Sequence, residues 1–113
     1  MEAVFKSGQT FTVFPLKVFY INKQENDQFS LACGVGAPAR VFKKAVERNR
    51  IKRLLREAYR LNKTELSGQI KSNNRQLTVF ILYIDKLMPA FATINKKMIQ
   101  ALGLLMQKVN ETN

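Results

Sequence analysis

The chain has 113 residues, enough for one domain with a modest core, and its 46% apolar content argues against a disordered polymer. Nineteen Lys and Arg against eight Asp and Glu give a formal net charge of +11, which points to a nucleic acid or an anionic membrane surface as partner. Histidine is absent and cysteine occurs once, so the usual Cys/His zinc sites and any histidine-based catalytic triad are excluded.

Residues 1–113 are expected to form a single cytoplasmic domain. No apolar run approaches the length of about 18 residues that a membrane span needs, and no secretory signal is recognisable. The eight carboxylates are scattered, and no pair has the spacing of an acid–base dyad. We therefore expect no catalytic residue and no metal site in the protein itself, and no association with a membrane.

The first part of the chain predicts a short helix followed by three strands. Residues 1–7 fit the end of a helix closed by Gly8, and because this helix would start without a cap we expect residues to precede it in the natural protein. Residues 11–21 are dense in β-branched and aromatic side chains and predict strand, with a break or edge at Pro15, which cannot donate to a ladder. Residues 29–35 predict the third strand.

The second of these strands has two largely apolar faces. One face carries Leu16, Val18 and Tyr20, and the other carries Lys17, Phe19 and Ile21. This pattern predicts a sheet covered by helices on one side, with a partly apolar groove on the other. In the third strand, Cys33 is expected to be a small buried hydrophobe. Residues 34–39 lack the endings of the known phosphate-binding loops, so their glycines are predicted to form a turn.

Residues 43–63 form the most strongly charged stretch of the chain. Nine of them are Lys or Arg and two are Glu, so the stretch carries +7 of the net +11. It has no Gly or Pro and predicts a helix of about five turns. One arc of this helix is apolar, with Ile51, Leu54, Leu55, Ala58 and Leu61. The opposite arc presents Arg48, Asn49, Lys52, Arg53, Arg56 and Arg60.

The basic arc predicts a polyanionic partner. Like charges recur at i,i+4 three times between residues 48 and 60, and each repetition costs a few tenths of a kcal/mol in an isolated helix. Arg40, Lys43 and Lys44 add cations at the helix N-terminus, where they oppose the helix dipole unless an anion binds there. The alternative, a solvated charged surface, normally mixes signs, and here only Glu57 interrupts the arc.

The last part of the chain predicts a loop, a strand and a helix. Residues 64–76 are polar and predict the loop, and residues 77–83 form a continuous apolar run typical of a strand buried on both faces. Apolar residues at three- and four-residue spacing over 91–109 predict an amphipathic helix, in which Met98 and Met106 are core residues. One sheet with helices packed against it, an α+β fold, accounts for this order.

The segment 43–58 resembles the signature helix of the bacterial ribonuclease P protein component. The family pattern A-V-x-R-N-R-x-K-R-x-x-R-E, which is long and specific, is matched from Ala45 to Glu57. Residues 4–8 resemble the end of the family's first helix, and the apolar strand and the last helix follow in the family's order. The resemblance covers most of the chain, although outside the signature it is one of pattern.

This resemblance implies a fold and a function. The fold is an αβββαβα two-layer sandwich with an unusual left-handed βαβ crossover. The function is that of the protein subunit of ribonuclease P, a ribonucleoprotein endonuclease that removes the 5′ leader of precursor tRNA. Its RNA subunit performs the hydrolysis with bound Mg²⁺, so the implied partners are the catalytic RNA and precursor tRNA. No cofactor held by the protein and no obligate protein partner are expected.

The resemblance also assigns residues. Those expected to contact RNA are Lys43, Lys44, Arg48, Asn49, Arg50, Lys52, Arg53, Arg56 and Arg60. The leader is expected in a cleft between the first helix, the sheet and the signature helix, with Phe5, Tyr20, Arg40 and Lys44 as candidates. A core role stays open for both aromatic rings. The chain starts part-way through the family's first helix, and Ala39 replaces a commonly basic residue, which weakens the expected leader contacts at both places.

Three hypotheses remain at this point. The first is the RNA-binding subunit of a ribonucleoprotein nuclease. The second is a ribosomal or other structural RNA-binding protein, which the basic composition fits equally well. The third, a nuclease that works without RNA, is disfavoured because histidine is absent and the carboxylates are unpaired.

Overall fold

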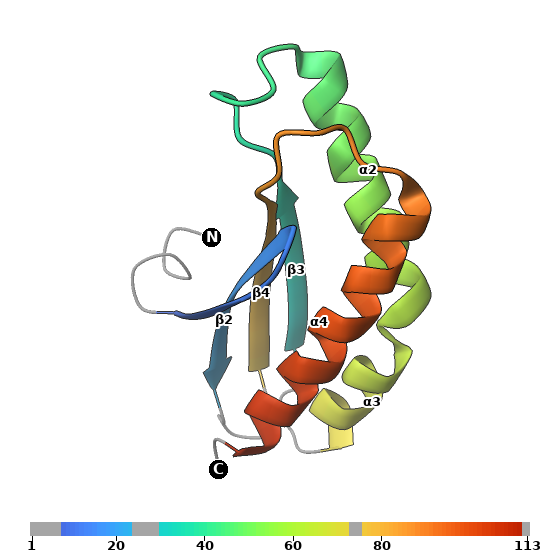
Figure 1. Ribbon diagram of the computed structural model, residues 1–113. Coiled ribbons are helices and arrows are strands. Elements are labelled where there is room, and N and C mark those ends of the chain that lie inside the picture. The colour runs from blue at the N-terminus through green and yellow to red at the C-terminus, as the bar shows by residue number, and fades with distance from the viewer. Residues whose placement is uncertain (1–7, 24–29, 73–75, 112–113) are drawn as a thin grey trace.

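The computed structural model describes residues 8–23, 30–72 and 76–111 (Figure 1). Within them the chain forms, in order, β1 (Gln9–Val13), β2 (Leu16–Lys23), β3 (Ser30–Gly36), α2 (Ala45–Asn62), α3 (Thr64–Ser72), β4 (Gln76–Tyr83) and α4 (Phe91–Glu111). The three strands predicted before the basic helix, the basic helix itself and the last strand and helix are confirmed. The helix predicted at residues 1–7 lies outside the described residues.

The four strands form one sheet in the order β1-β2-β4-β3. β1 pairs with β2 and β2 with β4 in antiparallel fashion, whereas β3 runs parallel to β4. Because α2 and α3 connect β3 to β4, this connection is a βαβ crossover (Figure 1). Its left hand, which the resemblance implies, stays a prediction. The expected break at Pro15 is confirmed, since β1 ends at Val13 and the Phe14–Pro15 peptide bond is cis.

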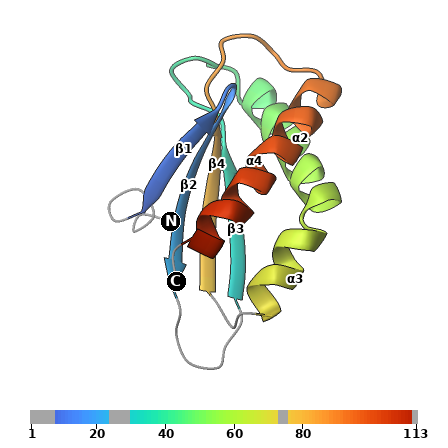
Figure 2. The ribbon, with the colours of Figure 1, turned by 60° about the horizontal axis from the view of Figure 1, so that its bottom comes forward.

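The helices cover one face of the sheet, so the molecule has two layers (Figure 2). α4 packs against α2 and over β1 and β2, and α2 lies over β3. The interface between the layers holds a core of fully buried side chains, which includes Leu16, Val18, Val79, Ile81, Ile51, Leu55, Ile94, Met98 and Leu105. The α+β fold with a sheet covered by helices on one side is therefore confirmed, and the face of β2 that the helices cover is the one with Leu16, Val18 and Tyr20.

Two strand predictions were wrong in detail. The residues of β4 alternate between buried and half-buried, so this strand is fully buried on one face and not on both. Its apolar residues on the other face, Phe80 and Leu82, belong to the surface of the sheet opposite the helices. Gly34 and Gly36 do not form a turn, because β3 continues through Gly36. The apolar run of β4 therefore belongs to a strand with one half-open face, and the glycines belong to β3 rather than to a loop.

The segment 64–76 is not a loop over most of its length, because residues 64–72 form α3. Leu66 and Ile70 lie four residues apart on its inner face, and both are fully buried. Burying each such side chain stabilises by about 1.5–3 kcal/mol, which outweighs the roughly 1 kcal/mol that Gly68 costs in a helix. The Gln69 side chain also donates to the Met106 carbonyl of α4 at 3.2 Å.

The apolar arc of α2 is narrower than predicted. Ile51, Leu55 and Ala58 are buried, but Leu61 is 51% exposed. The inner face continues instead through Asn62, whose amide donates to the Ala58 carbonyl and to Asn95 Oδ1 of α4, both at 2.7 Å. Among the residues that the structure describes, no helix is long and apolar enough to cross a membrane.

Candidate nucleic-acid interface

α2 places its basic residues on the side facing away from the core. The outward positions that are exposed include Asn49, Arg50, Arg53, Arg56 and Arg60, while Arg48 and Lys52 are half-buried at the flank. This arrangement follows from the 3.6-residue period, because burial of Ile51, Leu55 and Ala58 turns the other side of the helix to solvent. The predicted division of α2 into an apolar and a basic face is thus confirmed.

The charges of this face are almost unopposed by the protein's own acids. Within residues 8–23, 30–72 and 76–111, the one carboxylate that pairs with an α2 cation is Glu57, which accepts from Arg60. This contact raises the pKa of the Arg60 guanidinium further, through the hydrogen bond and the negative charge of Glu57. Arg53 and Arg56, in contrast, project from the same face and form no ion pair with a carboxylate in the described part of the chain. The face can therefore accept several phosphates at once.

Arg48 holds the segment that leads into α2. Its Nη1 donates to the carbonyls of Phe42 at 2.7 Å and Lys43 at 3.0 Å. The buried ring of Phe42 packs against Tyr83 with 6.0 Å between ring centroids, which anchors the same segment to the sheet. Arg48 is thus a positioning residue for the cations before the helix.

The cations before α2 are gathered at one end of the molecule. Arg40, Lys43 and Lys44 are all exposed. Lys44 is the N-cap residue of α2 and makes no side-chain capping hydrogen bond, so the first amides of the helix and three cations occupy the same end. Positive groups concentrated at a helix N-terminus favour an anion, as the sequence predicts.

The other two leader candidates are placed differently. Tyr20 is 3% exposed, lies on the helix-covered face and donates from its hydroxyl to Gln9 Oε1 at 2.8 Å. On the neighbouring strand β4, the residue opposite Tyr20 is Val79, and the residue opposite Leu16 is Tyr83. Phe42, in the segment that carries Arg40 and Lys44, packs on Tyr83, so this segment lies at the Leu16 end of β2. Tyr20 is therefore not brought together with Arg40 and Lys44, and its burial favours the core role that the sequence left open. Phe5 lies outside the described residues.

Aromatic residues that the sequence did not single out lie on the opposite face of the sheet. Phe19 and Phe80 are direct cross-strand partners there, both half-buried, and the Lys17 ammonium lies 5.3 Å from the centroid of the Phe19 ring. Gly36 gives Phe80 its room, because a β-carbon at residue 36 would lie 2.7 Å from Cζ of that ring. The sequence of β2 already indicated that Phe19 lies on this face. The charged Lys17 marks the face open to solvent, and Phe19, two residues later in the strand, lies on the same face.

This open-face platform, defined by Lys17, Phe19 and Phe80, has the composition of a single-strand binding surface. Aromatic rings offer faces on which unpaired bases stack, and a neighbouring cation attracts the backbone. The described residues contain no cluster of three His, Cys, Asp or Glu side chains that could hold a metal ion.

Comparisons with known proteins agree with this geometry. The family model described as Ribonuclease P matches residues 1–105. A relative from Porphyromonas gingivalis, named ribonuclease P protein component, is 34% identical over 90% of this chain and 74% of its own length. A relative of the same name from Chlorobium phaeobacteroides is 36% identical over 86% of this chain and 73% of its own.

Solved structures share the fold. The RNase P protein from Staphylococcus aureus superposes with a TM-score of 0.68 at 18% identity, covering 92% of this chain and 86% of that one. The RNase P protein from Thermotoga maritima gives 0.67 at 24% identity, covering 89% and 86%. At these identities the structural likeness establishes the fold alone. The sequence relatives favour the first of the three hypotheses, the RNA-binding subunit of a ribonucleoprotein nuclease.

Proposed function

The chain belongs to the ribonuclease P protein family, and from this premise we propose that the basic face of α2 binds the catalytic RNA subunit of the holoenzyme. As a member of that family it is the protein subunit of the endoribonuclease that matures the 5′ end of tRNA. The observation that carries the RNA-binding role is the row of exposed arginines that no carboxylate of the described chain neutralises, apart from Glu57 beside Arg60.

Arginine suits this task for a physical reason. Its planar guanidinium meets a phosphate with two hydrogen bonds and stacks on unpaired bases, whereas a lysine offers a point charge. Folded RNA presents both an irregular backbone and exposed loops. Exposed Asn49 lies among these arginines and can bond a ribose hydroxyl or a base edge. The Mg²⁺ that supports the hydrolysis is proposed to be held by the RNA.

We propose further that the 5′ leader of precursor tRNA lies on the open-face platform. Stacking on Phe19 and Phe80 is tolerant of base identity, which suits a protein that serves many precursors. The half-buried state of both rings and the Lys17 ammonium beside Phe19 support this placement over one at buried Tyr20. Arg40 and Lys44 remain candidates for the backbone of the leader where it nears α2.

Reconstitution tests the function. We expect the protein to raise cleavage of precursor tRNA by a cognate catalytic RNA at low magnesium, because neutralising phosphates lowers the cation concentration that the RNA needs. The protein alone should leave precursor tRNA intact. A protein that binds the RNA without any gain in cleavage would instead fit a structural RNA-binding role, and cleavage by RNA-free protein would revive the idea of an independent nuclease.

A further inference from the structure

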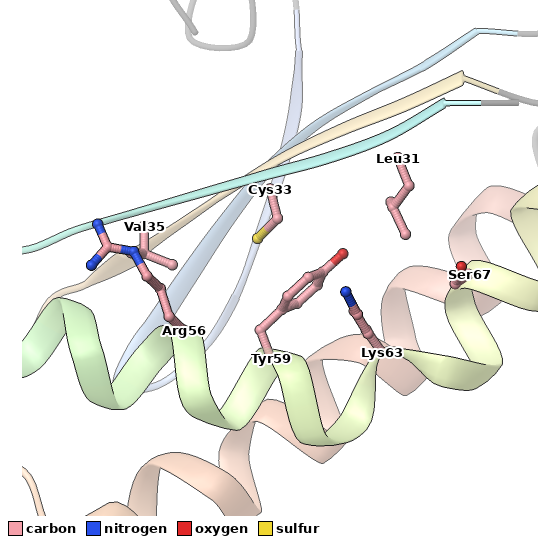
Figure 3. Close-up of a pocket in the computed structure, with 7 residues that line it drawn as sticks. All are labelled: Leu31, Cys33, Val35, Arg56, Tyr59, Lys63 and Ser67. Atoms are coloured by element: carbon pink, nitrogen blue, oxygen red, sulfur yellow. The ribbon is translucent and has the colours of Figure 1, made fainter.

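A pocket of about 430 Å³ opens beside the basic face of α2, between α2, the start of α3 and the edge strand β3 (Figure 3). Its floor consists of Leu31, Cys33 and Val35, which are alternate residues of β3 on the helix-covered side. All three are half-buried and pack against the hydrophobic core. The volume lies within the range of about 300–1,000 Å³ that is usual for small-ligand sites.

The helix side of the pocket is aromatic and cationic. Tyr59 projects from α2 toward β3, and Arg56 and Lys63 project on either side of it (Figure 3). Ser67 of α3 closes the remaining side. None of the seven residues that line the pocket carries a carboxylate, so in the described part of the chain its two cations meet no negative charge within it.

The two weak acids of the pocket stay neutral. Burial raises the pKa of the Cys33 thiol to about 12, although the positive charge of Lys63 opposes this shift. Burial also raises the pKa of the Tyr59 phenol, and the nearby Cys33 adds to that effect. The pocket therefore combines a net positive rim with a largely apolar floor and three uncharged polar groups, which belong to Cys33, Tyr59 and Ser67.

We propose that this pocket accepts one unpaired nucleotide of the bound RNA, with the base over the β3 floor beside Tyr59 and the phosphate between Arg56 and Lys63. The proposal deepens the function above and rests on it. Arg56 belongs both to the basic face and to the pocket, so a strand that follows α2 reaches the opening without leaving the positive surface. An apolar floor contributes nothing to a lone phosphate, and bases stacked in a duplex cannot enter.

Variants in the reconstituted complex give the first test. Tyr59→Leu should weaken binding of the catalytic RNA about fivefold or more, because it removes a stacking surface, whereas Tyr59→Phe keeps the ring and should stay within about twofold of wild type. Lys63→Gln should reduce the salt slope by about 0.7–0.9, the effect of one lost phosphate contact. Lys96→Gln, an exposed lysine of α4 outside the pocket, removes the same charge and should leave the slope unchanged.

The chain's single cysteine provides the second test, because it lies in the pocket floor. Alkylation of Cys33 by iodoacetamide is followed over hours at about pH 9, because the raised pKa of the thiol leaves little reactive thiolate at neutral pH, and it should slow when a short single-stranded RNA saturates the protein. A duplex RNA with the same number of phosphates, also at saturation, should protect far less. Equal protection by both, or protection by neither, would contradict insertion of a base.

These outcomes separate the two proposals. If wild-type protein binds no catalytic RNA, the proposed function fails. If wild type binds RNA while Tyr59→Leu, Lys63→Gln and wild type bind alike, with unchanged melting temperatures, only the pocket assignment fails. Lys63 is exposed, so its substitution keeps the test decisive even if Tyr59→Leu destabilises the fold.

Discussion

Gly36 shows how a single missing side chain can shape a binding surface. A β-carbon at this residue would lie 2.7 Å from Cζ at the tip of the Phe80 ring, which is too close for two carbon atoms, so the ring can take its position only because residue 36 is glycine. The sequence suggested a turn for this glycine because turns are its commonest use. Its actual role, a close approach between a strand and an aromatic ring on the neighbouring strand, depends on the register of β3 against β4, which no local pattern contains.

Substitution of Gly36 by alanine tests this role. The new methyl group should push the Phe80 ring aside, since the atom it meets is the far end of a rotatable side chain. We expect a small loss of stability but a clear loss of affinity for leader-bearing tRNA. Thermal melting and equilibrium binding measure the two effects separately, and Gly68→Ala, where an added β-carbon meets nothing within 4 Å, is the matched control. An unchanged affinity would remove Phe80 from the leader site.

The buried Cys33 thiol should make the free energy of unfolding fall as the pH rises above 9. Burial raises the pKa of its thiol from 9.0 to about 12, so above pH 9 the unfolded chain loses this proton before the folded one does. The contribution is fully present below pH 9 and is lost between pH 9 and pH 12, by up to about 1.4 kcal/mol per pH unit. Urea unfolding between pH 8 and pH 10 should show this fall in the free energy of unfolding, and Cys33→Val should flatten it.

Titration of the tyrosines limits that experiment to pH values below about 10, the ordinary pKa of a tyrosine. The pKa of Tyr83 is raised from 10.0 to about 12, by burial and by the charge of Asp85, so its effect begins only above pH 10. Below pH 10 a difference between wild type and Cys33→Val belongs to the thiol. Parallel pH profiles of the two proteins would mean that solvent reaches Cys33 in the folded state.

At the scale of the element, the burial of α2 residues was predicted correctly where it follows from the helical period. It was predicted less well where it depends on how the neighbouring helix packs. The spacing of Ile51, Leu55 and Ala58 fixed which side enters the core. Leu61 lies on the same predicted arc but remains half-exposed, because α4 docks along α2 through Asn62 and Asn95. A helical wheel has no information about the direction from which a second helix approaches.

α3 was missed for a related reason. Gly68 and the polar residues around it dominate the local propensity of this segment. Its Leu66 and Ile70 carry the helical signal, but two residues at i,i+4 spacing become decisive only when a surface exists to bury them. That surface is formed by β3 and α4, which are distant in the sequence. Short helices of this kind depend on tertiary burial, so the sequence pattern alone favoured a loop.

The arginines of α2 should differ in their contribution to RNA binding. Arg53 forms no ion pair in the described part of the chain, whereas Arg60 is paired with Glu57. Arg53→Gln should therefore reduce the slope of log affinity against log salt by about 0.7–0.9, the value for one lost phosphate contact. Arg60→Gln should change the slope less, because Glu57 already cancels part of its charge. Fluorescence titrations over a range of KCl measure both slopes, and equal slopes for the two variants would contradict this ranking.

For the whole molecule, the sequence yielded the two-layer fold and the basic face but not the choice of sheet surface for the leader. Each face of β2 carries one aromatic ring, and the two rings, Phe19 and Tyr20, belong to consecutive residues. Which face the helices cover is decided by the packing of α4 over β1 and β2, a contact between the two ends of the described chain (Figure 2). The resemblance implied a cleft, and Tyr20 was the β2 ring predicted to line it, whereas the structure places Phe19 on the open face.

Substrates with and without a leader decide between the two rings. Phe19→Leu should weaken binding of precursor tRNA to the holoenzyme about fivefold or more, because one stacked base is worth about 1–3 kcal/mol, and should leave mature tRNA unaffected. Tyr20→Phe removes the hydroxyl that donates to Gln9 and should affect both substrates equally, through stability alone. If Tyr20→Phe instead discriminated between the substrates while Phe19→Leu did not, the leader would have to be assigned to the helix-covered side of the sheet. The helix dipole and the cations Arg40 and Lys44 would then have to guide it, since they lie where α2 begins.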